Sequence, residues 1–241
     1  MELIICKDYE DLSQKASEII ISMLKENPKS ILGLATGSTP EGMYANLVKA
    51  NENNEISFKD VKTFNLDEYY GLDPENDQSY RYFMNDKLFN HVDINKEYTR
   101  VPSGTIENPG EYGKKYDEEI ENTGGTDIQV LGIGANGHIG FNEPSDVFTP
   151  ETHLVKLTEK TISDNSRFFE NIDDVPKEAI TMGMKSIMSA KKVLLIANGK
   201  NKADAIYKSL RGPIDPKVPA SILQVHPDLV VILDEDAASL L

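Results

Sequence analysis

Short apolar runs alternate with amphipathic helical segments along almost the whole chain, and this alternation limits the possible folds more than any other feature. Runs rich in Val, Ile and Leu predict strands at 3–6, 31–35, 61–66, 128–133, 193–197 and 229–233. Helical patterning predicts helices at 11–25, from Pro40 onward, and at 78–89, 109–122, 163–171 and 202–210. Because the strands are apolar without alternation, both faces of the sheet must be covered. We therefore predict an α/β fold, with a doubly wound, mostly parallel, Rossmann-like sheet and helices on both faces.

The same pattern continues from end to end of the 241 residues, a length suited to one large domain with a full core. No linker rich in Pro, Gly or Ser divides the sequence, and it contains no internal repeat. We expect a single domain spanning 1–241.

The strongly negative net charge limits the kinds of molecule that the protein is expected to bind. The formal net charge is -15 and the isoelectric point is about 4.7, so bulk electrostatics oppose binding to nucleic acid or to an anionic membrane. A few backbone N–H groups and cations can still hold a small anion locally. The single cysteine, Cys6, cannot form an internal disulfide, and no apolar run approaches the roughly 18 residues of a membrane span. With no apolar, positively charged leader, we expect a cytoplasmic protein.

Three polar segments, each following a predicted strand, carry most of the chemistry. They are 36–40, 67–70 and 134–143. Ligands of doubly wound sheets bind beyond the carboxyl ends of the strands. We therefore expect the three segments to meet at one crevice.

The third segment belongs to the glycine-rich run LGIGANGHIGFNEP (131–144), which carries Asn136, His138 and Glu143. A histidine is the side chain best suited to exchange a proton at neutral pH, and a neighbouring carboxylate or amide fixes its tautomer. The alternative is a histidine that only satisfies backbone groups of the loop. Metal binding is disfavoured because the remaining histidines lie in unrelated contexts: His91, His153 and His226. We therefore favour the hypothesis that His138 takes part in proton transfer.

The first segment contains Thr36, Gly37, Ser38 and Thr39 and ends at Pro40, where a helix is predicted to begin. Free N–H groups, hydroxyls and the positive end of a helix make a phosphate cradle. The segment matches neither GxxxxGK[ST] nor GxGxxG. A helix cap with a tight turn would use the same residue types, so phosphate binding and simple capping both stay open here.

The second segment places two adjacent carboxylates, Asp67 and Glu68, at the end of a strand. A partly desolvated carboxylate can act as a base toward a carbon acid, because burial raises its pKa. Neighbours on extended backbone point in opposite directions, so only one of the pair is expected to face the site. The alternative role is that of a capping acid before a turn.

Two basic residues further along the chain could complete an anion site. Arg167 offers a planar fork of donors, and Lys202 lies near a helix start just after a strand. Taken alone, a residue of either kind is more often a surface charge than a ligand.

Together these residues resemble the family of glucosamine-6-phosphate deaminases, also called glucosamine-6-phosphate isomerases, in its short bacterial form. The likeness covers nearly the whole chain, in the family's order, through the motifs LATGSTP, FNLDEYYGL, QSYRYFM, GIGANGHIGFNEP, NSRFF, VPKEAITMG, GKNKA and LQVHP. The wider superfamily includes 6-phosphogluconolactonase, whose members usually lack FNEP after the GH.

The resemblance implies the substrate D-glucosamine 6-phosphate, the products D-fructose 6-phosphate and ammonia, and no metal or organic cofactor. Asp67 corresponds to the base that moves the C2 proton. His138, oriented by Glu143 and the residue at 136, corresponds to the group that assists opening of the pyranose ring. The resemblance also implies a phosphate site made of Gly37, Ser38 and Thr39 with the cations Arg167 and Lys202.

Asn136 departs from the family pattern, since many members carry Asp there. A neutral amide can position the imidazole but cannot stabilise an imidazolium by charge, so that role falls on Glu143. The chain also stops where longer, allosterically activated members continue, so the resemblance is not extended to an activator site or a hexamer. Its oligomeric state is left open between a monomer and a small homo-oligomer. Two other functions are weighed against the deaminase: a lactonase of the same fold, and a non-catalytic sugar-phosphate sensor.

Overall fold

A seven-stranded sheet forms the centre of the computed structural model, which describes residues 1–241 apart from the side chain of Phe168. All of its strand pairs are parallel. In sheet order the strands are β1 (Glu2–Cys6), β10 (Leu229–Asp234), β9 (Val193–Ala197), β6 (Ile128–Leu131), β2 (Ile31–Leu34), β3 (Lys62–Asn65) and β5 (Thr99–Arg100). The predicted doubly wound, mostly parallel sheet is confirmed.

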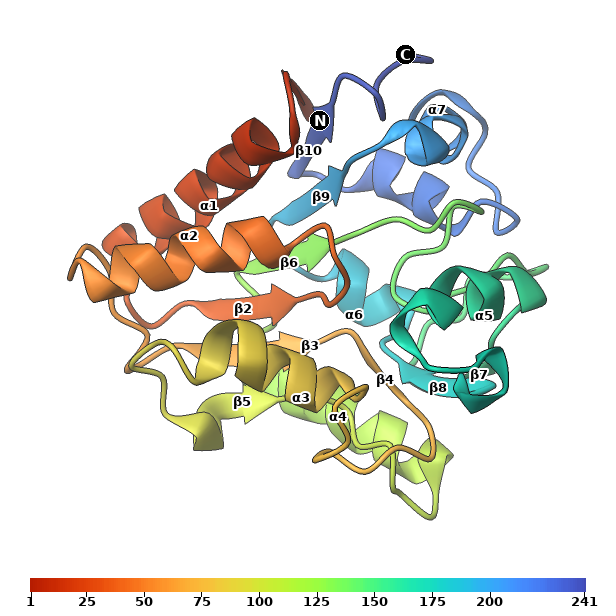
Figure 1. Cartoon of the computed structure of the whole chain (residues 1–241), viewed down its shortest axis with the longest axis horizontal. Helices are drawn as coiled ribbons and strands as arrows, with labels where there is room; N and C mark the ends of the chain where they lie inside the picture. Colours follow the sequence, from red (N-terminus) through yellow and green to blue (C-terminus); the bar gives the residue numbers. More distant parts are fainter.

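Helices cover both faces of this sheet, as right-handed crossovers require. The α-helices are α1 (Tyr9–Glu26), α2 (Glu41–Glu52), α3 (Tyr80–Met84), α4 (Pro109–Asn122), α5 (Glu159–Asn165), α6 (Met184–Met188) and α7 (Ala203–Arg211). Helices α1, α2 and α3 lie in front of the sheet in Figure 1, and α4 and α6 lie behind it. A π-helical turn, η1 (Asn85–Phe89), extends α3. The short 3-10 helices are η2 (Lys96–Tyr98), η3 (Ser166–Phe168), η4 (Ile172–Asp174), η5 (Lys200–Lys202) and η6 (Pro219–Val225).

Helix α1 shows how local chemistry sets an element's start and its buried face. The Asp8 side chain accepts a hydrogen bond from the Asp11 N–H at 2.9 Å, which caps the first turn. The fully buried residues Leu12, Ala16 and Ile20 recur every four positions and form a stripe that packs on the sheet. The helix predicted at 11–25 is therefore confirmed.

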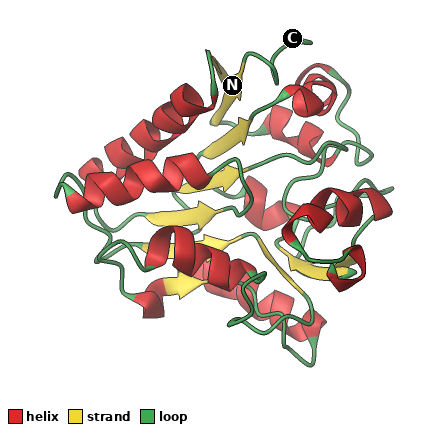
Figure 2. Cartoon of the chain, in the orientation of Figure 1, coloured by secondary structure: helices red, strands yellow, loops and turns green.

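The order of the strands reverses between β2 and β6. From β2 the chain proceeds to β3 and β5, and it then returns to the other side of β2 as β6 before continuing to β9 and β10. Such a switch leaves a crevice beyond the carboxyl ends of the two central strands. In Figure 1 the arrowheads of β2 and β6 point toward the side of the molecule where α5 lies, and loops gather there in Figure 2.

A small antiparallel sheet that we did not predict lies beside this edge, with the strand order β4 (Asp67–Tyr69), β8 (Glu178–Thr181), β7 (His153–Lys156). Asp67 pairs directly with Thr181. Leu66 connects the two sheets: its N–H donates to the Leu34 carbonyl at 3.1 Å, and its carbonyl accepts from the Met182 N–H at 2.7 Å. The segment that we expected to be a loop after β3 is therefore a strand of a second sheet.

The helix predicted at 163–171 is wrong in position. Thr158 is the N-cap of α5, and its hydroxyl accepts from the Thr161 N–H at 3.2 Å, so the helix starts four residues earlier than predicted. The helix ends at Asn165 and continues only as the short η3. Residues 169–171 lie outside both helices.

Candidate active site

The glycine-rich run after β6 folds into a tight turn that carries His138. The Gly134 N–H donates to the His138 carbonyl at 2.9 Å, and the Gly137 N–H donates to the Gly134 carbonyl at 2.9 Å. The imidazole lies directly over Gly134, where an added Cβ would be 2.3 Å from His138 Cε1. Only glycine fits beneath the ring, and the turn therefore sets the position of the histidine.

His138, Glu143 and Asn136 meet on one side of this turn. His138 Nδ1 lies 3.4 Å from Glu143 Oε2, which is an ion-pair contact when the ring is protonated and longer than a good hydrogen bond. Asn136 Nδ2 donates to the same oxygen at 2.7 Å, and Asn136 Oδ1 accepts from the His138 backbone N–H at 3.2 Å. The three residues that the sequence singled out in this run are thus in direct contact.

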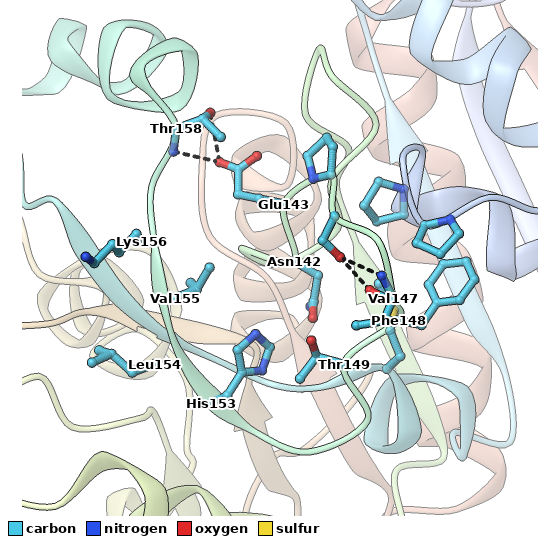
Figure 3. Close-up of a pocket in the computed structure, with 15 residues that line it drawn as sticks. Asn142, Glu143, Val147, Phe148, Thr149, His153, Leu154, Val155, Lys156 and Thr158 are labelled. Atoms are coloured by element: carbon cyan, nitrogen blue, oxygen red, sulfur yellow. Dashed lines mark hydrogen bonds between the residues drawn. The ribbon is translucent and has the colours of Figure 1, made fainter.

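The other oxygen of Glu143 is held by the start of α5. Oε1 accepts from the Thr158 N–H at 3.4 Å and from the Thr158 hydroxyl at 3.2 Å, as Figure 3 shows. The Thr161 hydroxyl donates to the same atom. Burial alone would raise the pKa of Glu143, but the hydrogen bonds and the positive charge of His138 lower it to about 2. Sequence reasoning missed both threonines, whose only signal was a Thr-x-x-Thr spacing at a helix start.

Glu143 and Thr158 also line a pocket of about 380 Å³, drawn in Figure 3. Most of its other walls come from 144–149 and from β7. Among the residues that the structure describes, neither Asp67 nor His138 lines it. The pocket therefore lies apart from the side of Glu143 that faces the histidine.

Asp67 begins β4 and is only 6% exposed. A Cβ added to Gly140 would lie 3.5 Å from Asp67 Oδ2 and 2.9 Å from Thr181 Oγ1, so the glycine-rich run passes close to the carboxylate. Gly140 also has a φ of 57°, which favours glycine. Burial, and to a smaller extent the negative charge of Glu68, raise the pKa of Asp67 well above its ordinary value. Asp67 and the His138 turn therefore belong to one site.

The Glu68 side chain points away from Asp67 and binds backbone N–H groups near the start of α3. Its carboxylate accepts from three backbone N–H groups, those of Tyr69 at 2.8 Å, Tyr80 at 2.9 Å and Arg81 at 2.9 Å. Burial raises the pKa of Glu68 to about 7, although these donors and the charge of Arg81 oppose the rise. The expectation that only one of the two carboxylates faces the site agrees with this geometry, because Glu68 holds the first turn of α3.

Aromatic rings pack beside the strand that carries Asp67. The Tyr69 ring centroid lies 4.8 Å from that of Tyr80 and 5.6 Å from that of Phe141, and Tyr80 stacks on Phe141 at 5.9 Å. The Asn165 amide donates to the Tyr69 hydroxyl at 2.8 Å, which connects this cluster to the end of α5. This aromatic packing forms a buried cluster on the strand that carries Asp67.

The hydroxyl-rich turn Thr36–Thr39 lies between β2 and α2. The Thr39 hydroxyl donates to Asn198 Oδ1 at 2.7 Å, which connects the turn to the segment after β9. The Ser38 carbonyl accepts from the Tyr9 hydroxyl at 2.9 Å, while the Ser38 side chain is exposed. No side chain at Pro40 caps the start of α2, but the Tyr9 hydroxyl accepts from the Gly42 N–H at 2.8 Å, so part of this helix start is already hydrogen-bonded.

The two predicted cations lie near each other. Lys202 ends η5, close behind Asn198, and burial lowers its pKa. The charge of Asp164 raises that pKa, while those of Arg167 and Lys160 lower it. The α5–η3 segment therefore lies within electrostatic reach of Lys202, although the two are distant in sequence.

Among the residues that the structure describes, no group of three or more His, Cys, Asp or Glu side chains is placed to hold a metal ion. None of the described helices is long and apolar enough to cross a membrane.

A hydroxyl-rich helix start and proton-transfer groups around the switch point of a doubly wound sheet are typical of α/β enzymes that act on small phosphorylated molecules. The chain belongs to the glucosamine-6-phosphate isomerase/6-phosphogluconolactonase family, whose model matches residues 7–231.

Named relatives agree with this membership. The chain is 54% identical to a glucosamine-6-phosphate deaminase of Clostridium novyi over 99% of both chains. It is also 54% identical to one of Clostridioides difficile, over 99% of this chain and 96% of the relative. A solved structure of a monomeric glucosamine-6-phosphate deaminase superposes with a TM-score of 0.97 at 45% identity over 100% of both chains. The 6-phosphogluconolactonase of Thermotoga maritima, at 20% identity and a TM-score of 0.74 over 97% and 99% of the two chains, shares the fold.

Proposed function

We propose that this chain converts D-glucosamine 6-phosphate and water into D-fructose 6-phosphate and ammonia. One observation carries the proposal: the crevice contains two separate sets of side chains suited to proton transfer, His138 with Glu143 and the buried Asp67. Opening a sugar ring and moving a proton between C2 and C1 require two such groups, whereas hydrolysis of a lactone requires no carbon-acid base. The relatives at 54% identity are named for the same activity.

In the first step His138 assists opening of the pyranose ring by moving a proton from the C1 hydroxyl to the ring oxygen. Glu143 stabilises the His138 imidazole when that imidazole is protonated, because Glu143 Oε2 lies 3.4 Å from His138 Nδ1. Asn136 is neutral, so it contributes by fixing the carboxylate and the backbone of the turn rather than by charge.

In the second step the Asp67 carboxylate takes the proton from C2 of the open-chain aldehyde. The electron pair moves to the C1–C2 bond, the carbonyl oxygen gains a proton, and an enolamine forms. Return of the proton to C1 leaves an imine at C2, and water adds there to release ammonia and leave the ketone. Desolvation makes the ionised carboxylate a stronger base, which suits it to a weak carbon acid.

The phosphate would be bound by the turn Thr36, Gly37, Ser38 and Thr39 and by Arg167 and Lys202. The supporting features are the hydroxyls and backbone N–H groups of this turn at the start of α2 and the electrostatic influence of Arg167 on Lys202. We also propose that residues 1–241 act as one catalytic unit, that it is a monomer like the solved relative so described, and that it works in the cytoplasm.

The test is release of ammonia from glucosamine 6-phosphate by the purified chain, coupled to detection of fructose 6-phosphate. Both products should appear in equal amounts without added metal or organic cofactor. Turnover of 6-phosphogluconolactone with no ammonia would identify a lactonase instead. Binding of glucosamine 6-phosphate with turnover of neither compound would identify a sensor.

A further inference from the structure

The carboxylate of Glu143 connects two parts of the molecule, because its two oxygens have different partners. Oε2 accepts from Asn136 and faces His138. Oε1 accepts from the start of α5, through Thr158 and Thr161. The Glu143 side chain is 7% exposed, so solvent cannot easily replace a lost donor.

The two threonines also fix each other. The Thr161 N–H donates to the Thr158 hydroxyl oxygen at 3.2 Å, and the Thr158 hydroxyl lies 3.1 Å from that of Thr161. Thr158 is the N-cap of α5 and Thr161 is buried in its first turn. Both hydroxyls therefore have positions set by the helix, and they hold Glu143 relative to α5.

The hydrogen bonds to Oε1 also affect the other oxygen, because two groups, Asn136 and His138, lie close to Oε2. Asn136 is 2.7 Å from that oxygen, while His138 Nδ1 is 3.4 Å away. A carboxylate released at Oε1 could rotate and turn its charge away from the His138 imidazole, while Asn136 keeps its hydrogen bond. The donors on Oε1 prevent this rotation.

We propose that Thr158 and Thr161 are positioning residues that hold Glu143 in the orientation from which it supports His138 during ring opening. The proposal rests on the proposed function. It extends the ring-opening machinery from the glycine-rich turn to α5, whose continuation carries Arg167. The competing explanation is that the two hydroxyls only cap the helix.

Thr161→Val tests the proposal, because valine keeps the shape and removes the hydroxyl. Thr161→Ser restores the hydroxyl, and Ser163→Ala removes an exposed hydroxyl from the same helix as a matched control. Turnover is measured on glucosamine 6-phosphate and on 5-deoxyglucosamine 6-phosphate, which lacks the hydroxyl that closes the pyranose ring. Titration of the Glu143 carboxyl carbon by NMR is measured in parallel and needs no substrate.

Thr161→Val should lower kcat/KM for glucosamine 6-phosphate about tenfold to a hundredfold, the effect expected for one hydrogen bond to a charged group. Turnover of the 5-deoxy compound should change less than about twofold, and the Glu143 titration should move up by about one pH unit. Thr161→Ser and Ser163→Ala should behave as the unaltered chain. Thr158→Val should show the same substrate contrast if Thr161→Val does not fold.

Equal losses on the two substrates would overturn the proposal in favour of a purely structural cap, as would an unchanged Glu143 titration. Absence of ammonia release by the unaltered chain would instead refute the proposed function, and with it the link to ring opening. The carboxyl titration would then still decide whether the threonines hold Glu143.

Discussion

Glu143→Gln is expected to destabilise the folded chain at neutral pH and to matter little in strong acid. Folding lowers the pKa of Glu143 from 4.5 to about 2. At about 1.4 kcal/mol for each pKa unit, this corresponds to about 3 kcal/mol of stability. The value is an upper limit, because an amide keeps an oxygen that can accept from Thr158 and Thr161. The charge of His138 also contributes only when the ring is protonated.

The pH window of this effect follows from the direction of the pKa change. A carboxyl whose pKa is depressed by folding stabilises the native state fully above its unfolded pKa, near 4.5. This contribution is lost as the pH falls toward the folded value, near 2. The part of the difference that comes from the hydrogen bonds of Glu143 should therefore be constant from neutral pH to about pH 5.5 and shrink below about pH 4.

Urea unfolding followed by circular dichroism at about pH 7, pH 5.5 and pH 3 measures this difference. We expect about 2 to 3 kcal/mol at the first two values and less than about 1 kcal/mol at the third. The new amide group at 143 would meet Asn136 donor to donor, so adding Asn136→Asp should recover part of the loss. A gap that persists undiminished at about pH 3 would refute the assignment of the stabilisation to the Glu143 charge.

Four further outcomes test the site. Asp67→Asn should abolish exchange of the C2 proton with solvent, measured by deuterium incorporation, while inhibition by inorganic phosphate persists; normal exchange would exclude Asp67 as the base. In the unaltered chain, burial raises the pKa of Asp67, so kcat should fall on the acid side at a pH above the usual carboxyl range, as a pH–rate profile would show. Asn136→Asp places a second carboxylate beside His138 and favours the protonated ring, so the alkaline limb of kcat/KM should move up by about one pH unit. Lys202→Met should raise KM for glucosamine 6-phosphate about tenfold or more. The unfolding midpoint should change little, because burying the Lys202 ammonium costs free energy of desolvation that the methionine does not require. An unchanged KM would exclude Lys202 from the phosphate site.

The central sheet could be predicted because most of its strands are continuous apolar runs in the local sequence. Strands β9 and β10 are buried at every position and are apolar along nearly their whole length. Helix α4 starts at a proline and matches its predicted range of 109–122. These signals lie within a few residues of one another, so no long-range information is needed to read them.

The small sheet could not be predicted in the same way. Strand β7 reads His-Leu-Val-Lys and β4 has only three residues, so neither has a periodic apolar pattern. What makes β4 a strand is its pairing with residues more than a hundred positions away, such as Thr181. That pairing is a property of the folded chain rather than of the local sequence.

The direct contacts within the candidate site were easiest to predict from the sequence where the residues share a motif. Asn136, His138 and Glu143 lie in one run and meet in the structure. The contacts of Thr158 and Thr161 with Glu143 could not be predicted, because a Thr-x-x-Thr spacing at a helix start is fully explained by capping. Their contact with Glu143 depends on how α5 docks, which no local pattern encodes.

Leu66 makes one backbone hydrogen bond to each of the two sheets, and Asp67 follows it directly. The central sheet has the larger buried core, while the small sheet packs on a separate, smaller apolar cluster around Tyr69 and Phe141. Segments with fewer buried contacts open at lower free energy than the global unfolding reaction. The backbone amides of β4 and β8 should therefore exchange with solvent through openings that leave β2, β6 and β9 closed. The proposed base would then belong to a less cooperative unit than the glycine-rich turn, and the two halves of the crevice could separate while most of the protein stays folded.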